Sequence, residues 1–272
     1  MSLVTDVRTR HSSRNRGPVA ATLLFARRTF YHMRNNGFGM AMETILSPII
    51  MLLIFAFLFG GAISGSVQSY ISYLLPGMLI LTVVPLTVYT GTTLCTDIAK
   101  GVYSRFRTIP FWQPAAVLGS VTAEGLRYSA ALISVLAAGM ALGFRPEGGT
   151  AGAVQALLYA LFFAYCVSWV FALIGNVAKR PETVSGTSMM AMYPLLFASN
   201  VLVDTSSMPG WLGTTIDWNP VSIAVRLVRG LLHGTATAAD LAAGIGLPLL
   251  LAALFAPMTM SVYQAQARTK SK

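Results

Sequence analysis

Charge is scarce in this chain. Asp, Glu, Lys and Arg make up only 10% of its 272 residues, whereas soluble domains contain about 25%. The scarcity is greatest between Thr44 and Thr96, where 53 consecutive residues carry no charge. Such a chain would aggregate in water, but helices in a bilayer satisfy their own backbone polar groups and expose apolar side chains to lipid. We therefore predict an all-α polytopic membrane protein with no large soluble domain.

Residue types that carry catalytic or metal chemistry are also few. There are two cysteines, Cys95 and Cys166, and three histidines that fall in different segments. Neither a disulfide framework nor a metal site is expected from them. The dipeptide Gly-Lys never occurs, which excludes a P-loop, and neither H-E-x-x-H nor G-x-S-x-G is present. The chain is predicted not to be an enzyme and to bind no cofactor of its own.

Long apolar runs predict six membrane spans, each of the roughly 20 residues that a bilayer requires. The predicted spans cover about 44–62, 70–93, 114–143, 153–177, 185–203 and 241–263. Around them we predict a cytoplasmic tail at 1–17, an amphipathic interfacial helix at 18–37, a transmembrane domain at 38–267 and a cytoplasmic tail at 268–272.

Basic residues are distributed unevenly about these spans. Of the 19 Lys and Arg residues, 15 fall in the N-terminal segment, in the loops after the second and fourth spans and at the C-terminus. Only Arg145, Arg226 and Arg229 fall on the other side, and Arg127 lies within a span. Because Lys and Arg collect in cytoplasmic loops, both termini are predicted to be cytoplasmic. The net charge of +10 is thus attributed to topology and not to nucleic-acid binding.

The segment 18–37 has the pattern of an amphipathic helix. Pro18 suits a helix start and Gly37 suits a stop. Apolar residues recur there at intervals of four and three, and Arg27 and Arg28 lie off that stripe. Such a helix lies in the headgroup layer. It is either a topology anchor alone or also a docking element for a cytoplasmic partner, and we favour the second interpretation.

The longest internal cytoplasmic stretch runs from Asp97 to Pro110 and mixes charged residues with Tyr103, Phe106 and Ile109. A short helix across the membrane surface fits this composition, with its apolar residues as anchors. By itself the pattern is also that of an ordinary solvated loop.

The segment 204–240 is predicted to lie on the outer side. Trp211 and Trp218 suit a membrane interface, and Asn219 followed by Pro220 is typical of a helix start. The helix that follows has an apolar face of Val221, Ala224, Val228 and Leu231 and a second face with Arg226 and Arg229. We predict a pair of short outer helices, partly re-entrant, because non-helical backbone at membrane depth must be covered by protein or line a water-filled cavity.

Two charged residues, Glu124 and Arg127, lie three apart within the third predicted span. At this spacing they share one helix face and can pair. Charge inside a membrane is costly and frequently functional, so the pair is either structural or takes part in substrate passage or coupling. The same span contains Gly139 and Gly143, a GxxxG spacing that permits close helix contact.

Four features in order along the chain resemble the permease subunit of type 2 ABC exporters, in particular the daunorubicin-resistance type. They are the Arg-bearing helix ending near Arg34-Asn35-Asn36, the run Tyr73-Leu74-Leu75-Pro76-Gly77, the stretch Asp97 to Pro110, and the outer run Met208-Pro209-Gly210-Trp211-Leu212 with Asn219-Pro220 and Val228-Arg229-Gly230-Leu231-Leu232-His233-Gly234. The resemblance covers about 20–265. Ala99 stands where family members often have Glu before Lys-Gly, and Pro194 is followed by Leu195-Leu196 and not by a small polar pair.

The resemblance implies a bacterial plasma-membrane exporter in which two permeases face each other, identical or paralogous. Each would be carried by a cytoplasmic ABC ATPase subunit that binds ATP and Mg. The residues implied in coupling to that ATPase are Asp97, Lys100, Gly101, Arg105, Arg107 and Pro110, with Arg27 and Arg28 of the preceding helix. The outer residues that carry the family pattern are Pro209, Trp211, Asn219, Pro220, Arg229 and Gly230.

The substrate predicted first is an amphipathic drug or antibiotic, and a lipid or glycolipid is second. Aromatic and Met side chains suit flat, variable, apolar ligands. Candidate substrate-path residues are Phe55, Phe59, Met78, Met189, Tyr193 and Phe197, with Glu124 and Arg127. Other readings are an ion-coupled secondary transporter, for which Glu124 would be the site, a polysaccharide exporter, and a membrane enzyme or scaffold.

Overall fold

Every regular element in the computed structural model is helical over the residues that it describes, which are 37–100, 115–203 and 209–269. The elements are α2 Gly37–Ala41, the π-helix η1 Met42–Leu46, α3 Ser47–Ser64, α4 Val67–Ala99, α6 Ala115–Ala141, α7 Gly149–Val177, α8 Pro181–Phe197, α9 Gly210–Asp217, α10 Pro220–His233 and α11 Ala238–Thr269. The all-α prediction is confirmed for these ranges. The predicted tail at 1–17 and nearly all of the interfacial helix at 18–37 lie outside them.

Four helices in the described ranges are long and apolar enough to cross a membrane. They are Met42–Ala62, Val67–Ala99, Gly149–Val177 and Ala238–Tyr263, which correspond to the first, second, fourth and sixth predicted spans. The third and fifth predicted spans also form helices, α6 and α8. These two are not among the four helices that are long and apolar enough to cross a membrane.

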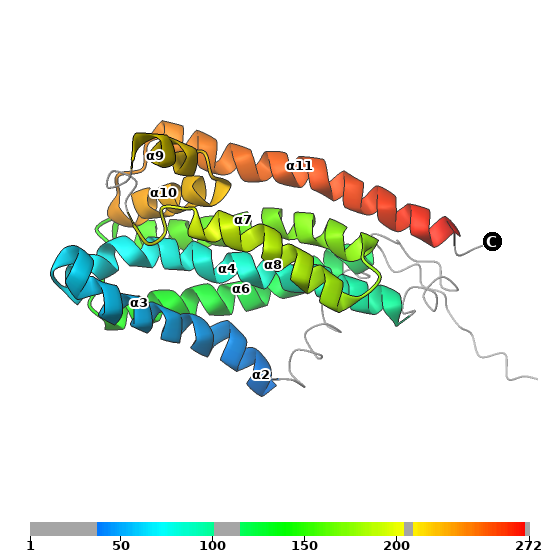
Figure 1. The fold of residues 1–272 in the computed structure, drawn as a ribbon, viewed down its shortest axis with the longest axis horizontal. Coiled ribbons are helices and arrows are strands. Elements are labelled where there is room, and N and C mark those ends of the chain that lie inside the picture. The colour runs from blue at the N-terminus through cyan, green and yellow to red at the C-terminus, as the bar shows by residue number, and fades with distance from the viewer. Residues whose placement is uncertain (1–36, 101–114, 204–208, 270–272) are drawn as a thin grey trace, which may run out of the picture.

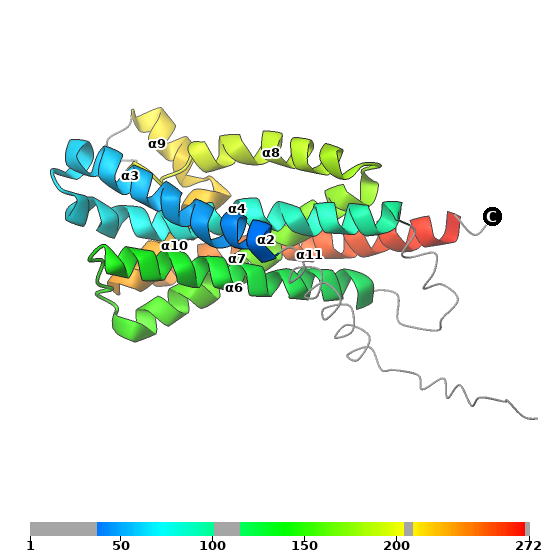
Figure 2. The same ribbon diagram turned by 90° about the horizontal axis from the view of Figure 1, so that it is seen from below.

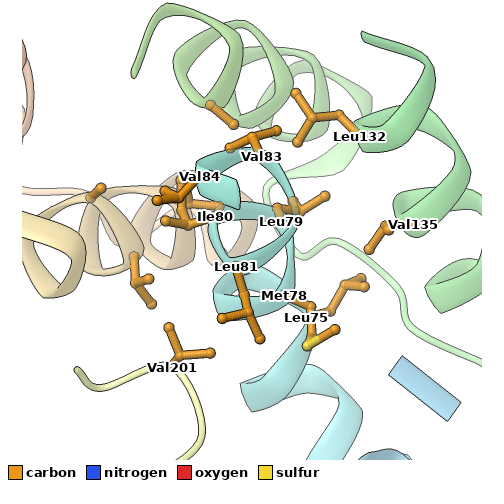
Figure 3. Close-up of a cluster of buried hydrophobic side chains, with 14 of the residues drawn as sticks. Leu75, Met78, Leu79, Ile80, Leu81, Val83, Val84, Leu132, Val135 and Val201 are labelled. Atoms are coloured by element: carbon orange, nitrogen blue, oxygen red, sulfur yellow. The ribbon is translucent and has the colours of Figure 1, made fainter. Parts of the chain in front are cut away.

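Helix α4 is the centre of the bundle. It packs against α3, α6, α7, α8 and α10, and most of its residues are buried. The helix continues through Pro76 and Pro85, and Ser66 caps its start by accepting a hydrogen bond from the backbone N–H of Ser69 at 3.2 Å. Figure 3 shows the core around α4, where Leu75, Met78, Leu79, Ile80, Leu81, Val83 and Val84 meet Leu132, Val135 and Val201.

Helices α4 and α7 approach each other closely at a pair of glycines. A Cβ atom on Gly175 would lie 2.2 Å from the carbonyl oxygen of Gly91, and one on Gly91 would lie 2.3 Å from the carbonyl oxygen of Phe171. No side chain fits at either position, so the two backbones are in direct contact. Of the predicted GxxxG pair, Gly139 packs against Leu75 of α4, whereas Gly143 has a φ of +100° just beyond the end of α6.

The long helices run along one axis, and their connections gather at two ends (Figures 1 and 2). One end carries the turn between α3 and α4, the connection between α6 and α7, and the short helices α9 and α10. The other end carries the last turns of α4, the turn between α7 and α8, and the C-terminal end of α11. Helices α6 and α8 lie on opposite sides of the bundle in Figure 2, in agreement with the packing of both on α4 and α7.

The π-helix η1 has a local cause in the sequence. Pro48, next to the start of α3, has no backbone N–H to donate to Thr44, and its ring crowds that carbonyl. The chain responds with wider i to i+5 bonding, in which Ser47 donates its backbone N–H to the carbonyl of Met42. Such bulges inside helices frequently mark functional sites, and this one contains Glu43.

Candidate functional site

Glu124 and Arg127 form an ion pair inside the bundle. Arg127 Nη1 lies 3.3 Å from Glu124 Oε2, and the two residues are only 9% and 2% exposed. The guanidinium carbon also lies 4.5 Å from the centre of the Tyr89 ring on α4, within the range of a cation–π interaction. An isolated charge that is buried away from water is costly. The two opposite charges and the ring therefore stabilise one another.

This pair is part of a larger group that reaches the surface. The hydroxyl of Tyr89 donates to Glu43 Oε2 at 2.8 Å, and Glu43 is exposed on η1. We call Glu43, Tyr89, Glu124 and Arg127 the charge cluster. It joins η1, α4 and α6, and the neighbouring hydroxyls of Thr90 and Tyr128 pair at 2.9 Å between α4 and α6. Sequence analysis found only Glu124 and Arg127; the available signal for Glu43 was its place directly before the 53 uncharged residues.

At the end of the bundle that carries α9 and α10, Asn219 connects α10 to the end of α8. Its side-chain oxygen accepts the backbone N–H of Val221 at 2.9 Å, which confirms the predicted helix start before Pro220. Its amide nitrogen donates to the carbonyl of Leu195 at 2.7 Å and also to that of Ala198. Carbonyls at a helix end have no partner inside the helix, so Asn219 satisfies α8 and starts α10 at once.

The two arginines of α10, predicted on one face of the helix, have different partners. Arg226 is exposed and lies 3.4 Å from Asp217 Oδ1. Arg229 is half-buried against α4, with its guanidinium carbon 3.9 Å from the centre of the Tyr73 ring, and it donates to the carbonyls of Tyr73 and Asn200 at 3.3 and 3.2 Å. Their partners differ because α4 packs along the side of α10 where Arg229 lies.

The remaining outer residues have distinct surroundings. Gly230 is buried, and a Cβ atom there would lie 2.9 Å from the Cα of Ala236. Pro209 precedes α9, and Trp211 and Trp218 at its two ends are 74% and 80% exposed. Helix α9 packs on α10. A partly re-entrant position for these helices stays a prediction.

The substrate-path candidates divide between the surface and the core. Phe55 and Phe59 of α3 contact each other with ring centres 5.8 Å apart, and Tyr193 and Phe197 of α8 do so at 6.1 Å. Phe59, Tyr193 and Phe197 are exposed, and Phe55 and Met189 are half-buried. Met78 is only 1% exposed and packs in the core of Figure 3, so it lies behind these surfaces and does not line them.

Of the predicted coupling residues, two are described. Asp97 is in the last turn of α4 and Lys100 directly follows that helix, at the end of the bundle opposite α9 and α10. The others, Gly101, Arg105, Arg107, Pro110, Arg27 and Arg28, lie outside the described residues.

Comparison with known protein families matches residues 20–233 to the ABC-2 type transporter. The chain belongs to this family. The charge cluster and the Asn219 and Arg229 contacts all fall within the matched residues, whereas α11 lies beyond them. The resemblance stated from the sequence is confirmed.

Named relatives of this ABC-2 permease are themselves permeases. It is 49% identical over 222 residues to the daunorubicin resistance ABC transporter permease protein DrrB1 of Streptomyces coeruleorubidus, covering 82% of this chain and 78% of the relative. It is 21% identical over 134 residues to the probable doxorubicin resistance ABC transporter permease protein DrrC of Mycobacterium tuberculosis, covering 49% and 48%. The chain is therefore the membrane-spanning subunit of an ABC transporter and belongs to a family of permeases, not of ATPases.

Replacing Asn219 by Ala is expected to destabilise the permease by about 2 kcal/mol, because it removes a helix cap and leaves two partly buried carbonyls without this donor. The measurement is unfolding in lipid nanodiscs. Arg226→Ala on the same helix is the matched control, since it breaks an exposed ion pair worth about 0–1 kcal/mol. Equal losses in the two variants would show that Asn219 does not join α8 to α10.

Proposed function

We propose that this permease exports a hydrophobic or amphipathic drug across a bacterial plasma membrane, driven by ATP hydrolysis on a separate subunit. The observation that carries the proposal is the 49% identity to a daunorubicin resistance permease over 82% of the chain. The Gly-Lys dipeptide of a P-loop does not occur in the sequence, and we assign ATP and Mg to the partner. A lipid is the second substrate class.

In the proposed arrangement α6 and α8 are the third and fifth of six spans. Helix α6 has 27 residues, about 40 Å at 1.5 Å each, which is sufficient to cross a bilayer core of about 30 Å. Its charges at Glu124 and Arg127 pair inside the protein. Helix α8 has 17 residues, about 26 Å, and the turn at 198–203 extends it. Six spans place both termini on the same side.

The cytoplasmic side is proposed to be the end that carries the last turns of α4. Lys100, Lys179 and Arg180 lie at this end, and basic residues collect on the cytoplasmic side. The opposite end then faces outward, with α9 and α10 partly re-entrant in the outer leaflet. Trp211 and Trp218 are exposed there, where amphipathic rings prefer to lie.

The ATPase partner is proposed to dock beside Asp97 and Lys100 and on the segment that continues to Pro110, with Arg27 and Arg28 as further contacts. Two ATPase copies and a second permease, identical or paralogous, complete the exporter. The substrate path runs along the exposed aromatic surfaces of α3 and α8, which include Phe59 and Tyr193. Nothing in this arrangement involves nucleic acid.

The test is ATPase activity of the permease in nanodiscs with and without a P-loop ABC ATPase subunit. Drug-stimulated activity is expected only with both proteins present. Arg105→Glu reverses a charge in the proposed docking segment and is expected to lower stimulation about tenfold, the effect of losing about 1.4 kcal/mol of coupling. Transport by the permease alone down a proton or sodium gradient would refute the proposal and would direct attention to Glu124.

A further inference from the structure

The first span presents an apolar stripe to the outside of the bundle, and a carboxylate stands at one end of it. Leu46, Ile50, Ile54 and Phe57 are 40–63% exposed and recur at intervals of four, four and three, so they share one face of the helix. Glu43 begins this face on η1 and is also exposed. Helix α3 lies on the outer surface of the bundle in both ribbon views (Figures 1 and 2).

The carboxylate of Glu43 has a hydrogen-bond donor but no counter-charge among the described residues. Tyr89 donates its hydroxyl to Oε2 at 2.8 Å, while the ion pairs of the described chain join Arg127 to Glu124, Arg226 to Asp217 and His233 to Glu147. Arg127, the cation of the charge cluster, is thus engaged by Glu124 at 3.3 Å. Two acids and one base leave one negative charge, and Glu43 is the acid that reaches the surface.

A carboxylate in these surroundings requires a particular kind of ligand. The exposed neighbours Phe38 and Met42 are apolar, and a charge bordered by apolar surface is stabilised most by an opposite charge at short range. Lipid tails can contact the apolar stripe, but they carry no positive charge that would pair with the Glu43 carboxylate. A molecule with one cationic group and a flat apolar body matches both the Glu43 carboxylate and the apolar stripe.

We propose that Glu43, oriented by Tyr89, anchors the protonated amine of an amphipathic organic cation whose apolar body lies along Leu46, Ile50 and Ile54. The inference rests on the proposed export function and assigns the residue that recognises the charge of its substrate. An amphipathic cation dissolved in a leaflet holds its amine near the headgroups and its apolar part among the acyl chains. Glu43 is the second residue of the span Met42–Ala62, so the site has the same orientation as a ligand arriving from the cytoplasmic leaflet.

Glu43 binds the ligand, and Tyr89 is a positioning residue that acts through Glu43. A merely structural Glu43 would hold η1 against α4 through the Tyr89 hydroxyl and would affect charged and neutral ligands alike. The two roles are separated by a pair of ligands, one with a protonated amine and one in which an acetyl group on that nitrogen has removed the charge. Daunorubicin carries a primary amine, and its N-acetyl derivative is neutral; both are fluorescent, so binding is measured directly on the permease in nanodiscs without the ATPase.

The wild-type permease is expected to bind daunorubicin at least tenfold more tightly than the N-acetyl derivative. Glu43→Gln is expected to weaken daunorubicin binding about tenfold, or 1.4 kcal/mol, and to change binding of the neutral derivative less than twofold. Tyr89→Phe keeps the ring and is expected to weaken daunorubicin binding about threefold, since it removes one hydrogen bond to the carboxylate. Glu182→Gln, an equal change of charge at an exposed residue of α8, is the matched control and should retain the preference.

Equal binding of the two compounds by the wild-type protein would overturn the proposal, as would an equal loss for both in Glu43→Gln. Transport in proteoliposomes that contain the ATPase separates this result from failure of the export function. ATP-driven transport without preference for the cation refutes the Glu43 site alone. Absence of ATP-driven transport for both compounds refutes the export function itself.

Discussion

Gly175→Val is expected to leave no folded permease in the membrane. A Cβ atom at this position would lie 2.2 Å from the carbonyl oxygen of Gly91 and 2.8 Å from its Cα. The obstructing atoms are backbone atoms of α4, so no rotamer change relieves the clash. Helices α4 and α7 would have to separate along an interface to which both contribute many buried residues.

Overpacking a core with flexible side-chain neighbours costs about 1–3 kcal/mol, and a clash of backbone with backbone costs more. Since total stability is about 5–15 kcal/mol, we expect loss of monodisperse protein after membrane extraction. Gly186→Val is the matched control, because a Cβ atom on Gly186 meets nothing within 4 Å and α8 remains helical around it. A Gly175→Val protein with the yield and melting temperature of the control would contradict the packing described for α4 and α7.

The glycine contact also shows where sequence-based prediction stopped. A GxxxG spacing drew attention to Gly139 and Gly143, yet the backbones of α4 and α7 meet at Gly91 and Gly175, each of which stands outside such a spacing. Close approach depends on which faces of two helices meet, and one sequence does not contain that pairing. The positions of the helices along the chain were easier to predict than their contacts, because each apolar run indicates a span by itself.

The predicted ends of the helices differ from the observed ends where packing extends a helix beyond its apolar run. The second span was predicted at about 70–93, whereas α4 runs Val67–Ala99. Its last turns are polar at Thr96 and Asp97, but Leu94 and Ile98 pack with Trp169 and Tyr263 from α7 and α11. A prediction from hydropathy ends with the apolar run, while the helix continues as far as neighbouring helices cover it.

The charge cluster was partly predictable for a related reason. Glu124 and Arg127 lie on one helix, so their spacing alone brings them together. Glu43, Tyr89 and Arg127 come from three elements, and only tertiary packing places them in a row. The same holds for Arg229, whose partner Tyr73 lies 156 positions earlier in the chain.

Arg127→Met is expected to destabilise the permease by about 3–5 kcal/mol, the cost of leaving a buried charge without its partner. Glu124 is 2% exposed, and no other basic residue in the described chain lies within ion-pair distance of it. Methionine approximates the volume of the arginine stem, so the loss reports charge more than packing. Stability is measured by detergent-induced unfolding in mixed micelles.

The double variant Glu124→Gln with Arg127→Met removes both charges and is expected to recover stability to within about 1 kcal/mol of the wild type, since replacing a buried ion pair by neutral groups is often nearly neutral. Recovery of this size shows coupling between the two residues, and a double variant as unstable as Arg127→Met would refute the pairing.

Because the recovered protein is folded, its drug-stimulated ATPase activity then separates the two roles that the sequence left open. Full activity would show that Glu124 and Arg127 have a structural role, since the transport cycle then proceeds without either charge. Activity lost from a protein of normal stability assigns the pair to substrate passage or coupling, for which its link through Tyr89 to Glu43 and the start of the first span gives the physical route.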